Sequence, residues 1–194
     1  MIIQRRYDMT IREGIKRSFK ELVFIETYEE ITVVSICKKA SISRAAFYDC
    51  FANKEAVLVS IVEDEIVGPQ LLIRHTLPTT KIKSSPQIML EMIYQNVKNN
   101  SAFYQHINKV EKGSLLKRII TDGFAAMNKG ILQDYDLPED EKHYCGFFFA
   151  AANAALISRW LDNGMDIEPA RLSQLFNKWT LSYWQKVSPD MTDW

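Results

Sequence analysis

Apolar residues recur at intervals of three and four along almost the whole chain, which is the spacing of one face of an α-helix. In residues 10–26 this stripe is formed by Ile11, Ile15, Phe19, Leu22, Val23 and Ile25, with charged residues opposite. No segment shows the strict alternation of apolar and polar residues that a half-buried strand would need. The sequence therefore predicts an all-α fold.

Capping and breaking residues divide this pattern into separate helices. Thr10, Ser43 and Asn53 are the expected N-caps of three of them, because their side-chain oxygens can accept from the free amides of a first turn. Glu13 would complete a capping box with Thr10. The expected helices cover residues 10–26, 33–40, 44–51, 54–67, 86–99, 102–108, 114–132, 138–163 and 169–187.

Composition limits the class of protein. Hydrophobic residues make up 47% of the 194 residues, enough for a core, and the formal net charge is zero. The charge is unevenly spread: residues 1–54 carry ten Lys and Arg against seven Asp and Glu, a net of +3, which leaves −3 for the remainder. A positive segment suits a partner with phosphates, although many solvated helices are as basic.

Sorting signals and metal motifs are absent from the sequence. The N-terminus has no apolar core of a signal peptide, and the longest apolar run, residues 145–157, is shorter than the roughly 20 residues of a membrane span. The three cysteines, Cys37, Cys50 and Cys145, form no Cys-x-x-Cys pair. We expect a cytoplasmic protein with reduced thiols, without a metal, a cofactor or a membrane partner.

The helix expected at residues 44–51 has two faces of different chemistry. Phe47 and Phe51 lie four residues apart and should point into the core, whereas Arg44 and Tyr48 share another face with small residues. Such a slim face fits the major groove of DNA, where an arginine can bridge guanine O6 and N7. Together with residues 33–40 this predicts a helix-turn-helix unit, whose second helix enters the groove. An ordinary buried helix is the alternative.

Residues 10–56 resemble the DNA-binding domain of TetR-family transcriptional regulators. The resemblance rests on Thr10 and on the segments "TVVSICKKA", "SISRAAFYDCF" and "NKEA", which begin at Thr32, Ser41 and Asn53. It implies an N-terminal three-helix DNA-binding domain, residues 1–54, and a C-terminal helical effector-binding and dimerisation domain, residues 55–194. The DNA-facing positions of the family correspond to Thr32, Ser43, Arg44, Ala45, Ala46, Tyr48 and Lys54.

The chain also departs from the family pattern. Thr27 and Ser41 stand where the family often has glycine, at turns that tend to need positive φ. Cys50 replaces a histidine that can reach a phosphate, and Asp49 places a negative charge near DNA. These departures bear on affinity for DNA more than on the fold.

The C-terminal helices are unusually apolar, which predicts a subunit interface in addition to a core. The resemblance implies that the last two helices pair with those of a second subunit and that the middle helices enclose a small effector. The expected dimer residues are Phe147, Ala151, Ala155, Leu172, Leu175, Phe176, Trp179 and Tyr183. The expected pocket residues are Tyr94, Phe103, Tyr104, Phe124, Met127, Tyr144 and Phe148, any of which could be core instead.

We therefore expect a DNA-binding regulator, a ligand-responsive repressor that binds a palindromic operator as a homodimer. The alternative is a co-regulator of the same fold that acts mainly through protein partners. An enzyme is not expected, because the histidines lack metal-ligand spacing and the sequence has neither a Gly-rich phosphate loop nor a nucleophile elbow.

Overall fold

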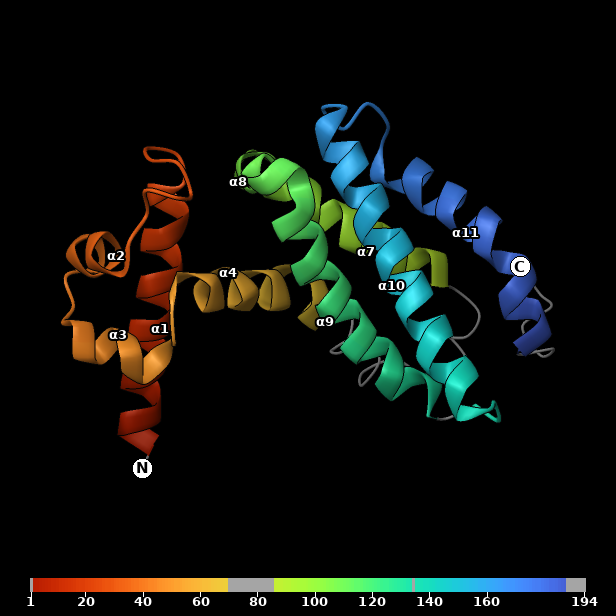
Figure 1. The fold of residues 1–194 in the computed structure, drawn as a ribbon, viewed down its shortest axis with the longest axis horizontal. Helices are drawn as coiled ribbons and strands as arrows, with labels where there is room; N and C mark the ends of the chain where they lie inside the picture. Colours follow the sequence, from red (N-terminus) through yellow and green to blue (C-terminus); the bar gives the residue numbers. More distant parts are fainter. Residues whose placement is uncertain (1, 70–85, 134, 188–194) are drawn as a thin grey trace. The chain divides into compact units, whose positions relative to one another are not determined.

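The computed structural model describes residues 2–69, 86–133 and 135–187, and in these ranges the chain forms helices and no strand (Figure 1). The predicted all-α fold is confirmed. Two compact units follow one another, Met1–Val62 and Glu63–Trp194. The boundary was expected between residues 54 and 55, a position that lies in the first turn of the helix Lys54–Val62 of the first unit.

The first unit consists of α1 (Ile2–Leu22), α2 (Val33–Ala40), α3 (Arg44–Cys50) and α4 (Lys54–Val62). The bounds of α2 match the predicted range, and those of α3 differ by one residue. Thr10 lies inside α1, which begins eight residues earlier, so the prediction that Thr10 caps this helix is wrong. The core of the unit gathers apolar side chains from all four helices, among them Ile15, Phe19, Ile36, Phe47, Val57 and Leu58.

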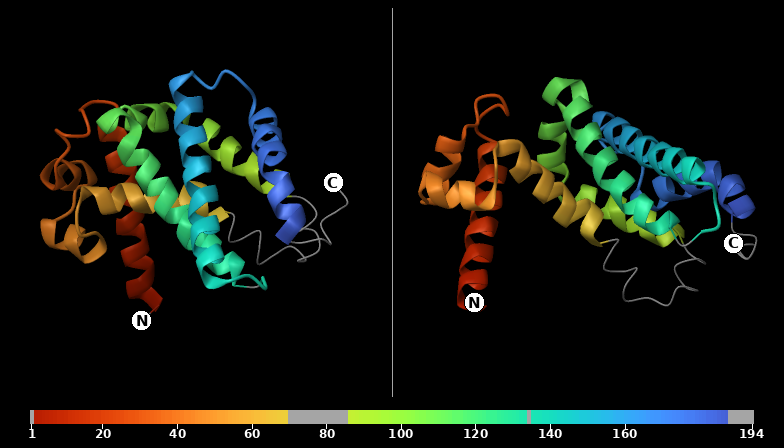
Figure 2. Two further views of the ribbon diagram at one scale, coloured as in Figure 1. Left: turned by 45° about the vertical axis from the view of Figure 1, so that its right-hand side comes forward. Right: turned by 60° about the horizontal axis from the view of Figure 1, so that its bottom comes forward.

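The second unit begins with a π-helical segment, η1 (Glu63–Val67), and continues with α7 (Pro86–Asn99), α8 (Ser101–Asn108), the 3-10 segment η2 (Val110–Gly113), α9 (Ser114–Leu132), α10 (Glu139–Asp162) and α11 (Pro169–Val187). The bounds predicted for α7, α9 and α11 are confirmed. In the views of Figures 1 and 2, α9 and α10 lie side by side and run in opposite directions. The last helix, α11, packs on α7.

Buried polar groups fix how these helices meet. Tyr94 on α7 donates a 2.8 Å hydrogen bond to the Asn153 side chain on α10, and both side chains are buried. Asn108, at the end of α8, donates to the Ser158 carbonyl and accepts from the Ser158 hydroxyl at 2.8 Å. Because a buried polar group is costly without a partner, each pair specifies one register between its helices.

The connection from α8 to α9 is unusually tight. Glu111, Lys112 and Gly113 all adopt positive φ. A Cβ atom at Gly113 would lie 2.9 Å from the Ser158 hydroxyl, so glycine permits this approach of η2 to α10. The turn therefore brings α9 against α10 directly after the Asn108 contact.

No helix in the described ranges is both long enough and apolar enough to cross a membrane.

Candidate nucleic-acid interface and partner surface

The predicted division of α3 into a core face and a surface face is confirmed. Phe47 is fully buried and Phe51, just after the helix, is 4% exposed. Arg44 and Tyr48 are exposed on the other side. The remaining side chains of the predicted DNA-facing set on and beside this helix, Ser43 and Ala45, are exposed, and Ala46 is half-buried. The helix thus presents one arginine, a phenol and small residues to solvent.

Caps at α2, α3 and α4 involve residues of the predicted interface. The Thr32 hydroxyl accepts from the Ser35 amide at 3.0 Å, and the Ser35 hydroxyl accepts from the Thr32 amide, which makes a capping box. The Ser43 hydroxyl accepts from the Ala46 amide at 3.1 Å. Asn53 accepts from the Ala56 amide at the start of α4. The caps predicted at Ser43 and Asn53 are confirmed, and Thr32 opens α2 as expected.

The turn between α2 and α3 has the strain expected from the sequence. Ser41 adopts φ 55° and ψ 43°, the left-handed region in which a side chain is unfavourable. Thr27 does not share this geometry, so the expectation of positive φ there is wrong. Its amide and hydroxyl instead donate to the Glu30 carboxylate at 3.0 and 2.9 Å. These two hydrogen bonds lower the pKa of Glu30.

Arg12 fastens α3 and α4 to α1. Its guanidinium donates to the Cys50 carbonyl at 2.9 Å and to the Ser60 hydroxyl at 3.1 Å, and it lies 4.1 Å from the centre of the Phe51 ring. The Cys50 carbonyl belongs to the last turn of α3, where a cation is favoured by the helix dipole. Sequence reasoning missed this role, because a polar residue opposite an apolar stripe is normally solvated.

Lys54 differs most from its expected role. Its ammonium donates to the backbone carbonyls of Tyr28 and Ile31, at 2.6 and 2.9 Å, rather than projecting from the start of α4. Its side chain is half-buried, and burial lowers its pKa, an effect opposed by the Glu29 carboxylate. This contact ties α4 to the segment that leads into α2.

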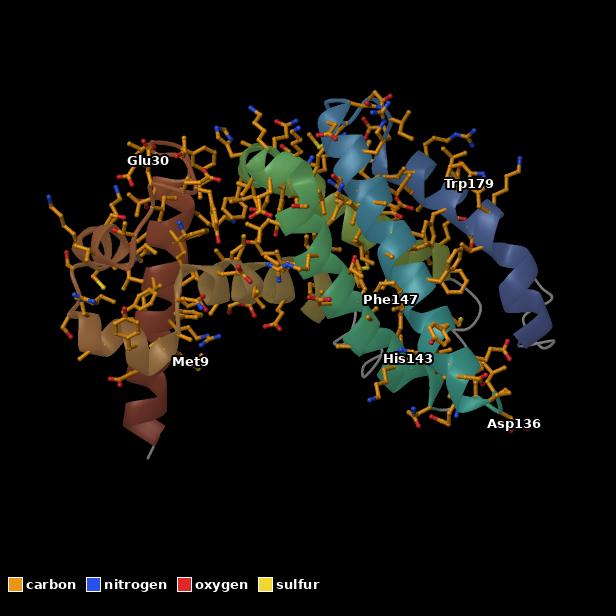
Figure 3. All side chains as sticks on the ribbon, viewed as in Figure 1. Met9, Glu30, Asp136, His143, Phe147 and Trp179 are labelled. Carbon is orange, nitrogen blue, oxygen red and sulfur yellow. The ribbon has the colours of Figure 1, made fainter. Side chains whose placement is uncertain are left out.

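Both α10 and α11 carry exposed aromatic side chains. Phe147 is 53% exposed on α10, and Trp179 is 60% exposed on α11; both are labelled in Figure 3. Ala151 is half-buried and Ala155 exposed on the same side of α10 as Phe147. On α11, Leu175 is half-buried, whereas Leu172 and Phe176 are buried within their own chain. The side chain of Tyr183 lies outside the described residues.

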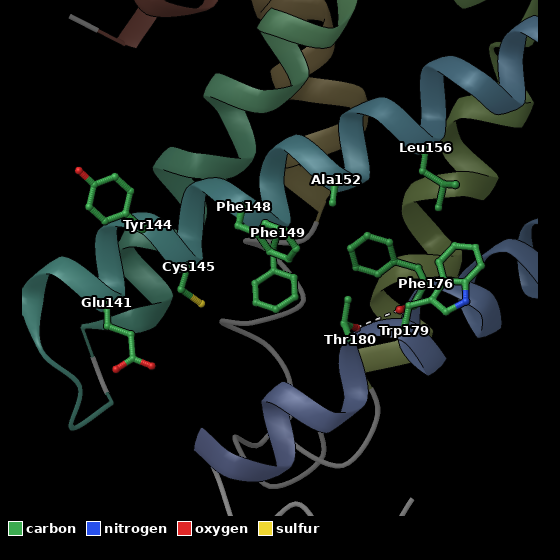
Figure 4. Close-up of a pocket in the computed structure, with 10 residues that line it drawn as sticks. All are labelled: Glu141, Tyr144, Cys145, Phe148, Phe149, Ala152, Leu156, Phe176, Trp179 and Thr180. Carbon is green, nitrogen blue, oxygen red and sulfur yellow. Dashed lines mark hydrogen bonds between the residues drawn. The ribbon is translucent and has the colours of Figure 1, made fainter.

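A pocket of about 500 Å³ lies between these two helices (Figure 4). Two residues of the predicted pocket set, Tyr144 and Phe148, line it, although both are largely exposed. Phe149 and Phe176, which belong to one apolar cluster, also line it. Glu141 and Thr180 also line it, and the Thr180 hydroxyl already donates a hydrogen bond to the Phe176 carbonyl. The pocket is therefore mainly apolar and aromatic.

The other residues of the predicted pocket set lie in the middle helices. Tyr94, Phe103, Tyr104 and Phe124 are buried, and Met127 is half-buried. The two tyrosines keep their hydroxyls satisfied inside the protein, Tyr94 by Asn153 and Tyr104 by Glu65. In this structure these side chains act as core.

The C-terminal half of the chain matches a known family. Residues 84–181, about half of the chain, match the model of a TetR transcriptional regulator C-terminal region. This range covers α7 to most of α11, the helices that carry the pocket and the exposed aromatic side chains.

Individual proteins extend the similarity over the first unit. An uncharacterized HTH-type transcriptional regulator of Bacillus subtilis strain 168, YxbF, is 28% identical over 90% of this chain and 45% of its own length. The chain thus spans less than half of that relative. The transcriptional activator of the dhaKLM operon of Lactococcus lactis strain IL1403, DhaS, is 25% identical over 84% of this chain and 85% of its own length.

The fold agrees with these similarities. The solved structure of a dihydroxyacetone kinase operon activator, DhaS, superimposes with a TM-score of 0.62 and covers 92% of this chain and 98% of its own, at 22% identity. The two chains share the fold, including the N-terminal helices. With the family match over the C-terminal region and the helix-turn-helix geometry of α2 and α3, the chain belongs to the TetR family of DNA-binding transcriptional regulators.

Proposed function

We propose that this regulator binds a palindromic operator as a homodimer, releases it when a small effector binds, and thereby represses transcription. The observation that carries the proposal is the exposed face of α3. Arg44 and Tyr48 point to solvent there, while Phe47 anchors the helix in the core. A guanidinium on a slim helix can read guanine in the major groove, and the neighbouring alanines fit a thymine methyl.

Phosphate contacts would come from the N-terminal ends of the two helices. Thr32 and Ser43 are exposed caps, and the helix amides beside them favour an anion. Such contacts fix the position of the protein on the duplex without reading its sequence. Arg44 and Tyr48 would then supply discrimination and further phosphate binding.

The homodimer would use the exposed aromatic surface of α10 and α11. Phe147 and Trp179 are large apolar side chains with more than half of their surface in water. Clusters of such residues mark interaction sites, because burying aromatic surface is strongly favourable. A two-fold dimer would place two α3 helices about 34–36 Å apart, one turn of DNA, and so require a palindromic site.

Effector control requires that the effector bind one state of the dimer more tightly than the other. The middle helices of the second unit offer an aromatic core in which the hydroxyls of Tyr94 and Tyr104 are hydrogen-bonded. A ligand that repacks these helices would act on the first unit through the chain itself, because η1 follows α4 without a break. Operator affinity would fall as a result.

Selection of bound fragments from genomic DNA tests the proposal. Purified protein should enrich fragments that share an inverted repeat, and the Arg44→Ala variant should enrich the same repeat much less strongly. A reporter gene behind the recovered site then gives the sign of regulation. Repression is expected, and activation, as in the name of the Lactococcus relative, would overturn that part alone. Absence of any shared site, even at low salt, would reject direct reading of DNA.

A further inference from the structure

The ammonium of Lys54 is held by three backbone carbonyls. It lies 2.6 Å from the Tyr28 oxygen, 2.9 Å from that of Ile31 and 3.3 Å from that of Glu29. An ammonium group has three hydrogens, so these acceptors account for all of its donors. The same nitrogen lies 4.4 Å from the centre of the Tyr28 ring, within the range of a cation–π contact.

The carbonyls belong to a segment that sets the entry of the chain into α2. Ile31 is buried and directly precedes Thr32, the N-cap of that helix. The ring of Tyr28 packs edge-on against Phe19 of α1, with 6.3 Å between the ring centres. Lys54 is the first residue of α4. It therefore links three helices around the one segment that decides where the α2 N-terminus lies.

This environment disfavours a phosphate contact by the same ammonium. To reach DNA, Lys54 would have to leave three acceptors and an aromatic face, and the carbonyls would lose a charged donor. A surface lysine gains its phosphate contact without such a loss. Burial of the Lys54 side chain also lowers its pKa, as expected for a cation that has exchanged part of its hydration for protein dipoles.

Arg12 makes comparable contacts at the C-terminal end of α3. Its guanidinium bonds the Cys50 carbonyl at the end of α3 and the Ser60 hydroxyl, and it covers the Phe51 ring. Arg12 thus holds the C-terminal end of α3, and Lys54 holds the segment that leads into α2. Of the ten Lys and Arg residues among residues 1–54, these two therefore already bond groups of their own chain.

We propose that Lys54 is a positioning residue, which sets the N-terminal end of α2 for contact with DNA and does not itself neutralise a phosphate. The inference rests on the proposed DNA-binding function, since it concerns how the α2 N-terminus meets the duplex. Thr32 and the α2 amides, rather than Lys54, then make the contact.

Salt dependence separates the two roles. Binding of the full-length protein to a fluorescent mixed-sequence duplex is measured over a range of NaCl concentrations for wild type, Lys54→Met and Arg44→Met. The slope of log K against log salt is negative, and each lost phosphate contact reduces its magnitude by about 0.9. Lys54→Met should keep the wild-type slope and bind more weakly at every salt concentration. Arg44→Met should lower the magnitude of the slope, because on a mixed-sequence duplex Arg44 has no guanine in register and falls back on a phosphate. If the magnitude of the slope fell by about 0.9 in Lys54→Met, the proposal would be overturned.

Amide NMR signals of the free protein provide a readout that needs no DNA. Lys54→Met should shift the backbone amides of residues 31–35, and Lys38→Met, a matched change at an exposed lysine of α2, should leave the amides of residues 31 and 32 in place. Unchanged signals at residues 31–35 in Lys54→Met would overturn the proposal. If the wild-type protein bound no duplex, the proposed function would fail, and these signals would still decide whether Lys54 sets the α2 N-terminus.

Acetylation of the wild-type protein covers the case in which Lys54→Met does not fold. Mass spectrometry after brief treatment with acetic anhydride should find Lys54 modified much more slowly than Lys38, at a rate that the duplex does not change. Rapid modification of Lys54 that slows on addition of the duplex would contradict a positioning role.

Discussion

The phenol of Tyr104 on α8 donates a 2.8 Å hydrogen bond to the Glu65 carboxylate in η1. Tyr104 is fully buried, and burial, with the charges of Glu65 and Asp64, raises its pKa well above the ordinary value. The phenol is therefore a neutral donor at physiological pH. Since η1 starts directly after α4, this bond fixes the first segment of the second unit to its core.

Removal of that hydroxyl should destabilise the second unit. Tyr104→Phe keeps the buried ring but deprives the Glu65 carboxylate of a donor, which should lower the free energy of unfolding by about 1.5–3 kcal/mol. Urea denaturation followed by circular dichroism measures the change. Tyr144→Phe is the matched control, because Tyr144 is 71% exposed, and it should have no effect. Equal stability of the two variants would show that the Tyr104 bond contributes nothing.

Relief of the turn between α2 and α3 should stabilise the protein. Ser41 has φ 55°, a conformation that glycine adopts without steric cost, so Ser41→Gly should raise the free energy of unfolding by about 1 kcal/mol. Ser41→Ala keeps a Cβ atom in the same conformation and serves as the control. Thermal unfolding of both variants checks this prediction, and a lower midpoint for Ser41→Gly than for Ser41→Ala would contradict it.

A charge on the aromatic surface of α10 should prevent self-association. Phe147→Glu would bury a carboxylate at the proposed dimer interface, a cost of several kcal/mol. Light scattering after size exclusion should give twice the 22.5 kDa chain mass for wild type and a single chain mass for the variant.

Ile25→Glu controls for the loss of an exposed apolar residue elsewhere, since Ile25 is 70% exposed in the first unit. It should leave the mass at that of wild type. The same mass for Phe147→Glu as for wild type would exclude this part of α10 from the interface.

Loss of the Arg44 side chain should reduce discrimination between sequences. Arg44→Ala should weaken binding to the selected operator by about 1–3 kcal/mol and change binding to mixed-sequence DNA much less. Competition titrations with the two duplexes measure both effects. An equal loss on both duplexes would assign Arg44 to the phosphate backbone.

Much of the fold follows from local signals in the sequence. Helical spacing located α2, α7, α9 and α11, and the Ser43 and Asn53 caps bond the amides that such caps serve. The strain at Ser41 was predictable because the TetR family often has glycine at this position, in a turn that tends to need positive φ. The start of α1 was not, because a threonine with a glutamate three residues later is equally compatible with the middle of a longer helix.

Tertiary contacts account for what the sequence did not predict. The family resemblance placed Lys54 among the DNA-facing residues, but the carbonyls that bind its ammonium come from residues 28–31, more than twenty positions earlier. The aromatics of the middle helices share one composition whether they fill a core or line a pocket. Only their burial distinguishes Tyr94 and Phe124 from Tyr144 and Phe148.

The central claim is that the protein reads a specific DNA sequence through α3. The most direct test is the ratio of its affinities for the selected operator and for a scrambled duplex of the same length and composition, at one physiological salt concentration. We predict a preference of about 10³-fold or more, with two chains bound per operator. Equal affinity for the two duplexes would contradict the account.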